Sequence, residues 1–370
     1  MRLVFWQNML AFHQAAHLRA LADHGHDVLI VADEALSEDR KAMGWSPPDF
    51  GAARIVVKPS DAEILRLVQE TPQDSIHIVG GYRGYRIGSI VLQHCLRLSI
   101  RAGLMSESGD PRGWKGLARR ARWTTEWLQF GRKVDFVLAM GQLGVRWFRA
   151  CGYSAAKILP YGYFVDLQKT LPPIASSDSS VVELIYVGQC VHRKGIDVAL
   201  RALASLKGRN WRLTILGGGA LLQDLQQLTC RLGVSEQVRF MPYLPHPQVL
   251  EHIAQSDLLV LPSRFDGWGV VVNEALLCGV PVICSDRCGA TDLLKASWRG
   301  QVFRSESIGD LRDLLAQWIA RGKRTAEETA QIRTWARCIQ GSSAAGYMLQ
   351  VFDHLYRGHS RPKPPWYEAE

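Results

Sequence analysis

The sequence has no run of about 18 apolar residues, the length that a helix needs to cross a bilayer, so we expect no transmembrane helix. It also has no Cys-x-x-Cys pair. Its eight cysteines are scattered among apolar neighbours, and even the closest two, Cys284 and Cys288, have no histidine-rich partner. This argues against a structural metal and favours the reduced, buried thiols of a cytosolic protein. The first residues lack the lysine-rich start and small-residue cleavage site of a signal peptide, so we expect a strand and a helix there.

Composition is typical of a soluble globular protein, with 47% hydrophobic and 21% charged residues. A chain of 370 residues is too long for one ordinary core and suits two domains. The formal net charge of +9 is compatible with nucleic acid, an anionic membrane face or phosphorylated ligands as partners. The position of the basic residues along the chain must decide among these three.

Short apolar strands alternate with helical stretches through the whole chain. Strands are predicted first at 3–7, 28–33, 75–80, 101–108 and 136–141. After a Pro/Ser-rich linker at 170–180, they are predicted at 182–188, 211–219, 237–243, 257–263 and 281–286. The pattern predicts an α/β protein of two doubly wound parallel sheets, with domains at 1–165 and 170–345 and a last helix at about 346–370 that packs back on the first domain. Ligands bind such sheets outside the carboxyl ends of the strands.

Two carboxylates, Asp266 and Glu274, stand eight residues apart in the otherwise apolar segment RFDGWGVVVNEALLCGVPVICSD. Gly267 and Gly269 predict a tight turn after a strand, followed by a short helix from about residue 270. Glycines let a ligand approach the free N–H groups of that helix closely, so the segment predicts an anion site best suited to a diphosphate. A plain strand-turn-helix, whose carboxylates only favour the helix N-terminus electrostatically, is the alternative.

The same segment closely resembles the carboxylate-x7-carboxylate motif of the retaining GT-B glycosyltransferases of family four (glycosyl transferases group 1). The resemblance implies a GT-B fold, in which two Rossmann-like domains face a central cleft and the second binds a nucleotide sugar. It implies that Glu274 binds the ribose and that Asp266 acts near the donor sugar. Asp266 stands where the family has Glu, which shortens its reach by one methylene group. The implied donor contacts at the helix start are Gly267, Trp268, Gly269 and Val270.

A second match to the family is YVGQCVHRKGIDVALRAL at 186–203. Arg193 and Lys194 would neutralise the leaving diphosphate there, and Gln189 stands where the family often has Arg. A solvated basic pair on a loop is the alternative interpretation of Arg193 and Lys194.

Two further stretches of the second domain resemble the family. The turn in LTILGGGALLQDL would place Gly217 and Gly218 beside the nucleotide. Alone it is also compatible with a dinucleotide fold, although Leu222 stands at the third glycine position of GxGxxG. RFMPYLPH occupies the family's base-contacting loop, with Pro242 and Tyr243 as donor contacts; Tyr243 could equally pack in the core.

The first domain resembles the family in outline only. Where relatives carry a Gly-Gly loop, this chain has QNMLAFHQ, in which His13 could bind acceptor or donor phosphate, or could be a polar residue that caps the helix. Many relatives carry a His at the end of a middle strand, where this chain has Glu107 or Ser108 and no His. A carboxylate there could orient or deprotonate the acceptor hydroxyl, or could face solvent. The candidate catalytic residues are therefore Asp266, Glu107 and His13.

Basic and aromatic residues interleave at 111–133, PRGWKGLARRARWTTEWLQFGRK. The mixture suits an anionic bilayer surface or the phosphates of a lipid-diphosphate acceptor. A solvated basic face with core tryptophans is the alternative. No recognised nucleic-acid module accompanies the segment, so we expect no nucleic-acid partner. The candidates for acceptor or membrane contact are Arg83, Arg112, Lys115, Arg119, Arg120 and Trp123.

The resemblance as a whole implies a retaining, metal-independent hexosyl- or related glycosyltransferase with a UDP- or GDP-type sugar donor. Its acceptor would be a saccharide, lipid-linked in cell-surface polysaccharide assembly, and its place the cytoplasm at the inner face of the membrane. No cofactor is expected. Two alternatives stay open: a nucleotide-sugar epimerase on the same fold, and a non-catalytic subunit that binds sugar nucleotide within a glycosyltransferase complex.

Overall fold

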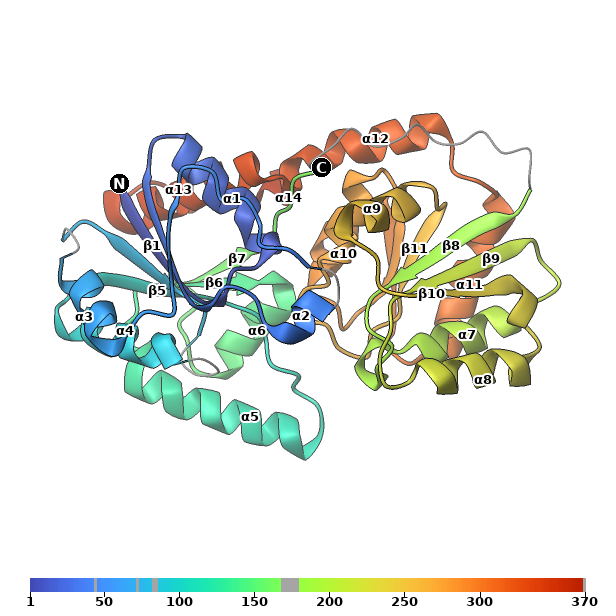
Figure 1. Ribbon diagram of the computed structural model, residues 1–370, viewed down its shortest axis with the longest axis horizontal. Helices are drawn as coiled ribbons and strands as arrows, with labels where there is room; N and C mark the ends of the chain where they lie inside the picture. The colour runs from blue at the N-terminus through green and yellow to red at the C-terminus, as the bar shows by residue number, and fades with distance from the viewer. Residues whose placement is uncertain (43–44, 71–72, 82–85, 168–179, 369–370) are drawn as a thin grey trace. The chain divides into compact units, whose positions relative to one another are not determined.

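A computed structural model describes residues 1–42, 45–70, 73–81, 86–167 and 180–368. The chain divides into two compact units (Figure 1). Unit 1 comprises Met1–Lys41, Ser46–Asp166 and Cys338–Ala369, and unit 2 is formed chiefly by Leu167–Arg337. Within the described ranges, no helix combines the length and the apolar character needed to cross a membrane.

Unit 1 is built on a seven-stranded sheet in the order β3-β2-β1-β4-β5-β6-β7, with every neighbouring pair parallel. Its strands are β1 (Arg2–Met9), β2 (Asp27–Glu34), β3 (Arg54–Val57), β4 (Ile76–Val79), β5 (Arg101–Ser106), β6 (Phe136–Met140) and β7 (Ile158–Tyr161). β4 and β6 are buried at every residue; β6 is therefore a continuous apolar run, whereas β4 encloses one polar residue, His77.

Helices cover both faces of this sheet. They are α1 (Phe12–Asp23), α2 (Glu38–Ala42), α3 (Asp61–Gln69), α4 (Arg86–Arg97), α5 (Gly113–Glu126), the π-helix η1 (Trp127–Gly131), α6 (Gly141–Ala150), α13 (Gly341–Arg357) and α14 (Pro365–Glu368). The C-terminal helix α13 lies beside α1 (Figure 1). It is tied to the sheet by Tyr347, whose hydroxyl donates to the Pro160 carbonyl at 2.8 Å.

Unit 2 has a six-stranded parallel sheet in the order β10-β9-β8-β11-β12-β13. Its strands are β8 (Val182–Val187), β9 (Trp211–Leu216), β10 (Val238–Met241), β11 (Leu258–Leu261), β12 (Val282–Ser285) and β13 (Gly300–Phe303). The helices are η2 (His192–Lys194), α7 (Ile196–Ala204), α8 (Leu222–Leu232), η3 (Ser235–Gln237), α9 (His246–Ala254), α10 (Val271–Leu277), η4 (Gly289–Leu294), α11 (Ile308–Arg321), α12 (Ala326–Ala336) and η5 (Arg337–Ile339), which crosses back to unit 1.

The expected pair of doubly wound parallel sheets is confirmed, and each predicted strand overlaps an observed one. Three strands were not predicted: β3, β7 and β13, each of four residues. The chain returns to unit 1 at Cys338, so the returning segment begins earlier than the 346 expected from the sequence.

Candidate functional site

The candidate site of unit 2 lies at the carboxyl ends of β8 and β11. These strands are neighbours in the sheet, yet β8 leads on to β9 at one side and β11 to β12 at the other. The loops that follow them therefore diverge, and this switch point is where open α/β sheets hold their ligands.

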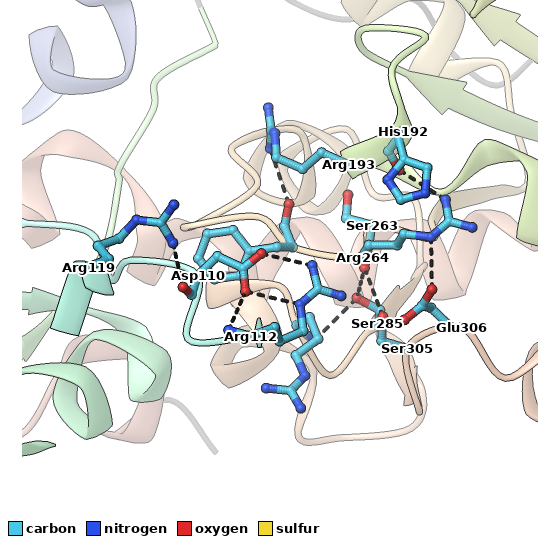
Figure 2. Close-up of polar contacts among 12 residues, drawn as sticks. Asp110, Arg112, Arg119, His192, Arg193, Ser263, Arg264, Ser285, Ser305 and Glu306 are labelled. Atoms are coloured by element: carbon cyan, nitrogen blue, oxygen red, sulfur yellow. Dashed lines mark hydrogen bonds and ion pairs between the residues drawn. The ribbon is translucent and has the colours of Figure 1, made fainter. Parts of the chain in front are cut away.

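A buried ion pair joins the two loops at the switch point. Lys194, at the end of η2, places Nζ 2.5 Å from Oδ2 of Asp266, which follows β11. Both side chains are nearly enclosed, at 14% and 12% exposure. Arg193 approaches the other oxygen, Oδ1, at 3.7 Å and donates to the Phe265 carbonyl at 3.2 Å (Figure 2). Two cations and a carboxylate thus converge where the sequence predicted a diphosphate site.

Arg264 fixes the loop that carries these cations, a role that the sequence does not reveal. Its guanidinium binds both carboxylate oxygens of Asp197 at 2.8 Å and donates to the His192 carbonyl at 2.9 Å. It also donates to Glu306 at 3.0 Å (Figure 2). The bidentate contact spans 67 positions of sequence and ties the first turn of α7 to the loop after β11, and the bond to the His192 carbonyl ties the loop after β8 to the same place.

Glu274 lies in the first turn of α10, whose observed start at Val271 matches the expected helix start near residue 270. Its side chain is 6% exposed, and Oε1 lies 2.9 Å from Nε2 of His246, the first residue of α9. Burial opposes protonation of His246, but the hydrogen bond to Glu274 and its negative charge outweigh burial and raise the pKa of His246 above its ordinary value. The carboxylate is therefore held by a histidine that gains positive charge readily.

The turn before α10 needs its glycine. Gly269 has a φ of +90°, and a Cβ there would lie 2.7 Å from the Cys288 sulfur. Trp268 beside it is fully buried, and its indole donates to the Asn273 side chain at 2.7 Å. A contact of Trp268 with a ligand would therefore come from its backbone. Gly267 and Val270 complete the turn at the helix start.

The loops after β8, β9 and β10 also meet. Gly217 has a φ of +139°, and a Cβ there would lie 2.1 Å from the Gly188 carbonyl oxygen, so the loops approach as closely as backbones can. The Gly218 carbonyl accepts from the Tyr243 hydroxyl and from the Cys190 amide, each at 2.7 Å.

The remaining predicted donor contacts lie in the same loops. The Gln189 carbonyl accepts from Tyr186 at 2.9 Å, and Pro242, next to Tyr243, is exposed. The Tyr243 hydroxyl is thus committed to the loop after β9, which leaves its partly exposed ring as the surface for a ligand.

In unit 1, a tyrosine joins the two candidate residues of that unit. Glu107 follows β5 directly, and its Oε1 accepts from the Tyr163 hydroxyl at 2.9 Å. The Tyr163 ring lies 4.1 Å, centroid to centroid, from the ring of His13 in the first turn of α1. Burial, and then the charge of Arg40, lower the pKa of His13 to about 3, so its imidazole is neutral at physiological pH.

Polar groups without partners gather at the same strand ends. Among the described residues, no hydrogen bond is made by either amide atom of Gln7, by Oε1 of Gln14 or by the hydroxyl of Ser108. Gln7 is near the end of β1 and only 4% exposed, Gln14 is in the first turn of α1, and Ser108 follows Glu107. Enclosed polar atoms are stable when water or a ligand bonds to them, so this end of unit 1 suits a ligand rich in hydroxyls.

The basic segment forms α5, and part of it is used within unit 1. The Arg112 side chain binds the Asp110 carboxylate at 2.9 and 3.0 Å, and Arg119 donates to the Asp110 carbonyl at 2.5 Å (Figure 2). Trp123 packs its ring edge-on against Trp147 and Phe148, with centroids 6.4 and 5.5 Å apart. This packing matches the alternative in which the tryptophans of the segment belong to the core.

One face of α5 is open to solvent. Trp114 is 74% exposed and Leu117 59% exposed, and Lys115 and Arg120 are exposed beside them. Arg83 lies outside the described residues. No group of three or more His, Cys, Asp or Glu side chains within the described ranges is arranged to hold a metal ion.

Solved structures share this two-unit architecture. The lipopolysaccharide outer core galactosyltransferase WaaB in its apo form matches with a TM-score of 0.70 and 17% identity, over 96% of this chain and 100% of that one. Anabaena HepE in complex with UDP matches with a TM-score of 0.72 and 15% identity, over 96% and 100%. Identities this low show the fold alone, and the protein has the GT-B fold.

Residues 169–335, which lie in unit 2, match the family model of the glycosyl transferases group 1. A GDP-mannose-dependent alpha-(1-6)-phosphatidylinositol monomannoside mannosyltransferase of Mycolicibacterium smegmatis is 31% identical over 41% of this chain and 42% of its own length. A D-inositol 3-phosphate glycosyltransferase of Catenulispora acidiphila is 34% identical over 48% of this chain and 46% of its own. The matched region thus spans less than half the length of these curated relatives.

Proposed function

We propose that the protein is a glycosyltransferase that moves a sugar from a nucleotide diphosphate donor to a hydroxyl of a saccharide acceptor, with retention of anomeric configuration. The observation that carries the proposal is the pairing of Lys194 with Asp266 at the switch point and of His246 in α9 with Glu274 in α10, within a unit that matches the group 1 family model. A relative that matches part of this chain is named a GDP-mannose-dependent mannosyltransferase, so its donor is a nucleotide sugar.

The donor's diphosphate is assigned to the loop after β8. Lys194 and Arg193 supply two positive charges there, and Asp266 holds both in place at 2.5 and 3.7 Å. In the transfer step the bond between the anomeric carbon and the diphosphate oxygen breaks, and the diphosphate leaves with the electron pair. Cations aimed at that oxygen stabilise the charge that develops on it. Glu274 then accepts hydrogen bonds from the ribose, and UDP and GDP are the nucleotide candidates.

The acceptor is assigned to the strand ends of unit 1. Neutral His13, the Glu107–Tyr163 pair, the unpartnered amide of Gln7 and the unpartnered Oε1 of Gln14 offer donors and acceptors suited to sugar hydroxyls. Glu107 is the candidate to orient the attacking hydroxyl or to take its proton.

The exposed face of α5 is assigned to an anionic membrane, which would make the acceptor lipid-linked and place the enzyme at the inner face of the cytoplasmic membrane. Trp114, Leu117 and Ala121 recur at helical spacing, so they share one face, and all three are exposed. Lys115 and Arg120 stand on either side of that face. An apolar stripe with basic flanks is the pattern of helices that lie in a bilayer interface.

The test is release of nucleoside diphosphate from a panel of UDP and GDP sugars, with and without lipid-linked saccharide, and with Glu274→Ala as the matched control. We expect release that depends on acceptor and falls at least 100-fold in the variant, together with an α-linked product from an α-linked donor. Conversion of the donor sugar without acceptor would indicate an epimerase instead. Donor binding with no turnover across the panel, equal in wild type and variant, would indicate a binding subunit.

A further inference from the structure

His246 has no place in the sequence motifs, yet it hydrogen-bonds to the most enclosed carboxylate of the candidate donor site, that of Glu274. It is the first residue of α9, and Glu274 lies 28 positions later in α10. The distance from Nε2 to Oε1 is 2.9 Å, and the Glu274 side chain is 6% exposed. The His246 side chain is 38% exposed, so the imidazole can exchange protons with solvent while it holds a buried group.

We propose that His246 is a positioning residue for Glu274: it binds Oε1 and turns Oε2 toward the ribose hydroxyls of the donor nucleotide. The inference rests on the proposed function, because it takes the ribose as the ligand of Glu274. A carboxylate that must accept from a ribose needs a fixed rotamer, and a hydrogen bond to its second oxygen supplies one.

The charged state of the pair decides how well it serves a diphosphate. A buried carboxylate without compensation repels the anionic nucleotide, whereas protonated His246 cancels its charge and forms a charge-assisted hydrogen bond. Glu274 raises the pKa of His246 against the opposing effect of burial, so the protonated form persists above pH 6.5. As the pH rises through that higher pKa, the proton is lost and the bond weakens.

Other titratable groups near the pair do not mimic this change. Cys278, one turn further along α10, has its pKa raised to about 12 by burial and then by the charge of Glu274, so it stays a neutral thiol. Asp266 is paired with Lys194 in the neighbouring loops. The remaining titratable side chains of α9 and the loop before it are Glu251, His252 and Tyr243.

Binding of UDP and of GDP, measured by calorimetry between pH 6 and 9, tests the proposal. For the wild type we expect affinity to fall about 5-fold across the raised pKa of His246, the difference between a charge-assisted and a neutral hydrogen bond. His246→Ala should bind about 5- to 10-fold more weakly at pH 6 and show no such fall. His246→Gln, which keeps a neutral donor, should recover part of the affinity without the pH dependence.

Controls separate this effect from folding and from the probe. The nucleotide's own phosphate also titrates, with a pKa of about 6, and the pH dependence of nucleotide affinity in His246→Ala reports that contribution alone. Dividing the affinity of the wild type and of each other variant by that of His246→Ala at the same pH removes it. His252→Ala removes a histidine of the same helix and should behave as wild type. If His246→Ala binds the nucleotide with the affinity and the pH dependence of the wild type, the positioning role is overturned while the proposed function stands. If the wild type binds neither nucleotide, the donor assignment itself fails, and the positioning role fails with it.

Discussion

At the scale of single residues, buried charge organises the candidate donor site. Asp266 and Glu274 are both nearly enclosed, and each is paired with a basic side chain from another segment, Lys194 of η2 and His246 of α9. Removing one member of such a pair leaves the other charge uncompensated, which costs stability as well as function. Single substitutions therefore need a partner variant before their effect on catalysis can be separated from their effect on folding.

Lys194→Ala should lower kcat/KM for the donor by about 100- to 1,000-fold, because it removes a cation from the leaving diphosphate. It should also lower the melting temperature, since Asp266 loses its 2.5 Å partner. Steady-state kinetics and calorimetry measure the two effects. The double variant Lys194→Ala/Asp266→Asn should regain stability without activity. Activity that returns together with stability would show that Lys194 is structural.

Tyr163→Phe removes the hydroxyl that donates to Glu107 at 2.9 Å and keeps the ring beside His13. We expect kcat/KM for the acceptor to fall about 5- to 10-fold, the worth of one hydrogen bond, with KM for the donor unchanged. The pKa of His13 is about 3, so its titration should not affect kcat/KM for the acceptor near pH 6.5. The pH dependence of kcat/KM in that range should be the same in His13→Ala and in the wild type. A difference between the two would contradict the neutral imidazole.

The sequence reveals some of these residues and hides others for a physical reason. Asp266, Glu274, Lys194 and the glycines belong to short motifs whose spacing is visible in the chain. His246, Tyr163 and Arg264 act through partners 28, 56 and 67 positions away. Such contacts exist only once the strands are ordered in the sheet, so no local pattern can indicate them.

At the scale of elements, α5 departs most from an ordinary helix of an α/β unit. Its buried side uses Gly116 and Glu126, whereas its apolar face carries Trp114 and Leu117 into solvent. Exposed apolar stripes of this kind indicate a surface that binds a membrane or a protein partner.

Trp114→Gln/Leu117→Gln should therefore abolish flotation with vesicles that contain anionic lipid at low salt. Burying two such side chains in the bilayer interface is worth about 1.5–3 kcal/mol each, so binding should fall by more than tenfold. Leu98→Gln is the matched control, since Leu98 is 48% exposed on another segment of unit 1. Equal flotation of the double variant and the control would count against a membrane role for α5.

Several of the predicted strands share a continuous buried, apolar run. β1 and β2 were predicted because each carries such a run within eight residues, and β6 because it is buried at all five of its residues. β3 was not, because it forms the edge of the sheet with Ile55 and Val57 exposed, and its four residues give no clear period. β7 is interrupted by the half-buried Pro160, and β13 carries the 40% exposed Val302, so neither shows the fully buried run of the equally short β4, β11 and β12.

At the scale of the whole molecule, the count of two units followed from chain length and from the restart of the β/α pattern. The return of the chain to unit 1 depends on contacts that the sequence does not display. Asp166, the last residue of unit 1 before the crossing, binds Arg19 at 2.9 Å and accepts from the Gly341 amide at 3.0 Å. Asp166 therefore binds both Arg19 of α1 and Gly341, which follows the return of the chain to unit 1.

Unit 1 also encloses histidines that resist protonation. His17 is 1% exposed, and burial, followed by the charge of His13, lowers its pKa to about 3. His77 is fully buried and accepts from the Trp6 indole at 3.0 Å, and burial, followed by the charge of Arg2, lowers its pKa to about 3. Both rings ionise near pH 6.5 once the chain unfolds, so the unfolded state binds more protons between pH 6.5 and 3.

Stability of unit 1 should therefore be highest above pH 6.5 and fall steadily as the pH is lowered toward 3. At pH 5 each histidine costs about 2 kcal/mol of unfolding free energy, from about 1.5 pH units at 1.36 kcal/mol each. Urea titrations of the full chain at pH 7.5 and 5, followed by near-ultraviolet circular dichroism, measure the loss. His17→Leu removes one titrating ring and should reduce that loss by about 2 kcal/mol. The same substitution at exposed His359 should leave it unchanged. An identical pH dependence in His17→Leu and wild type would show that His17 is protonated, or hydrated, inside the folded unit.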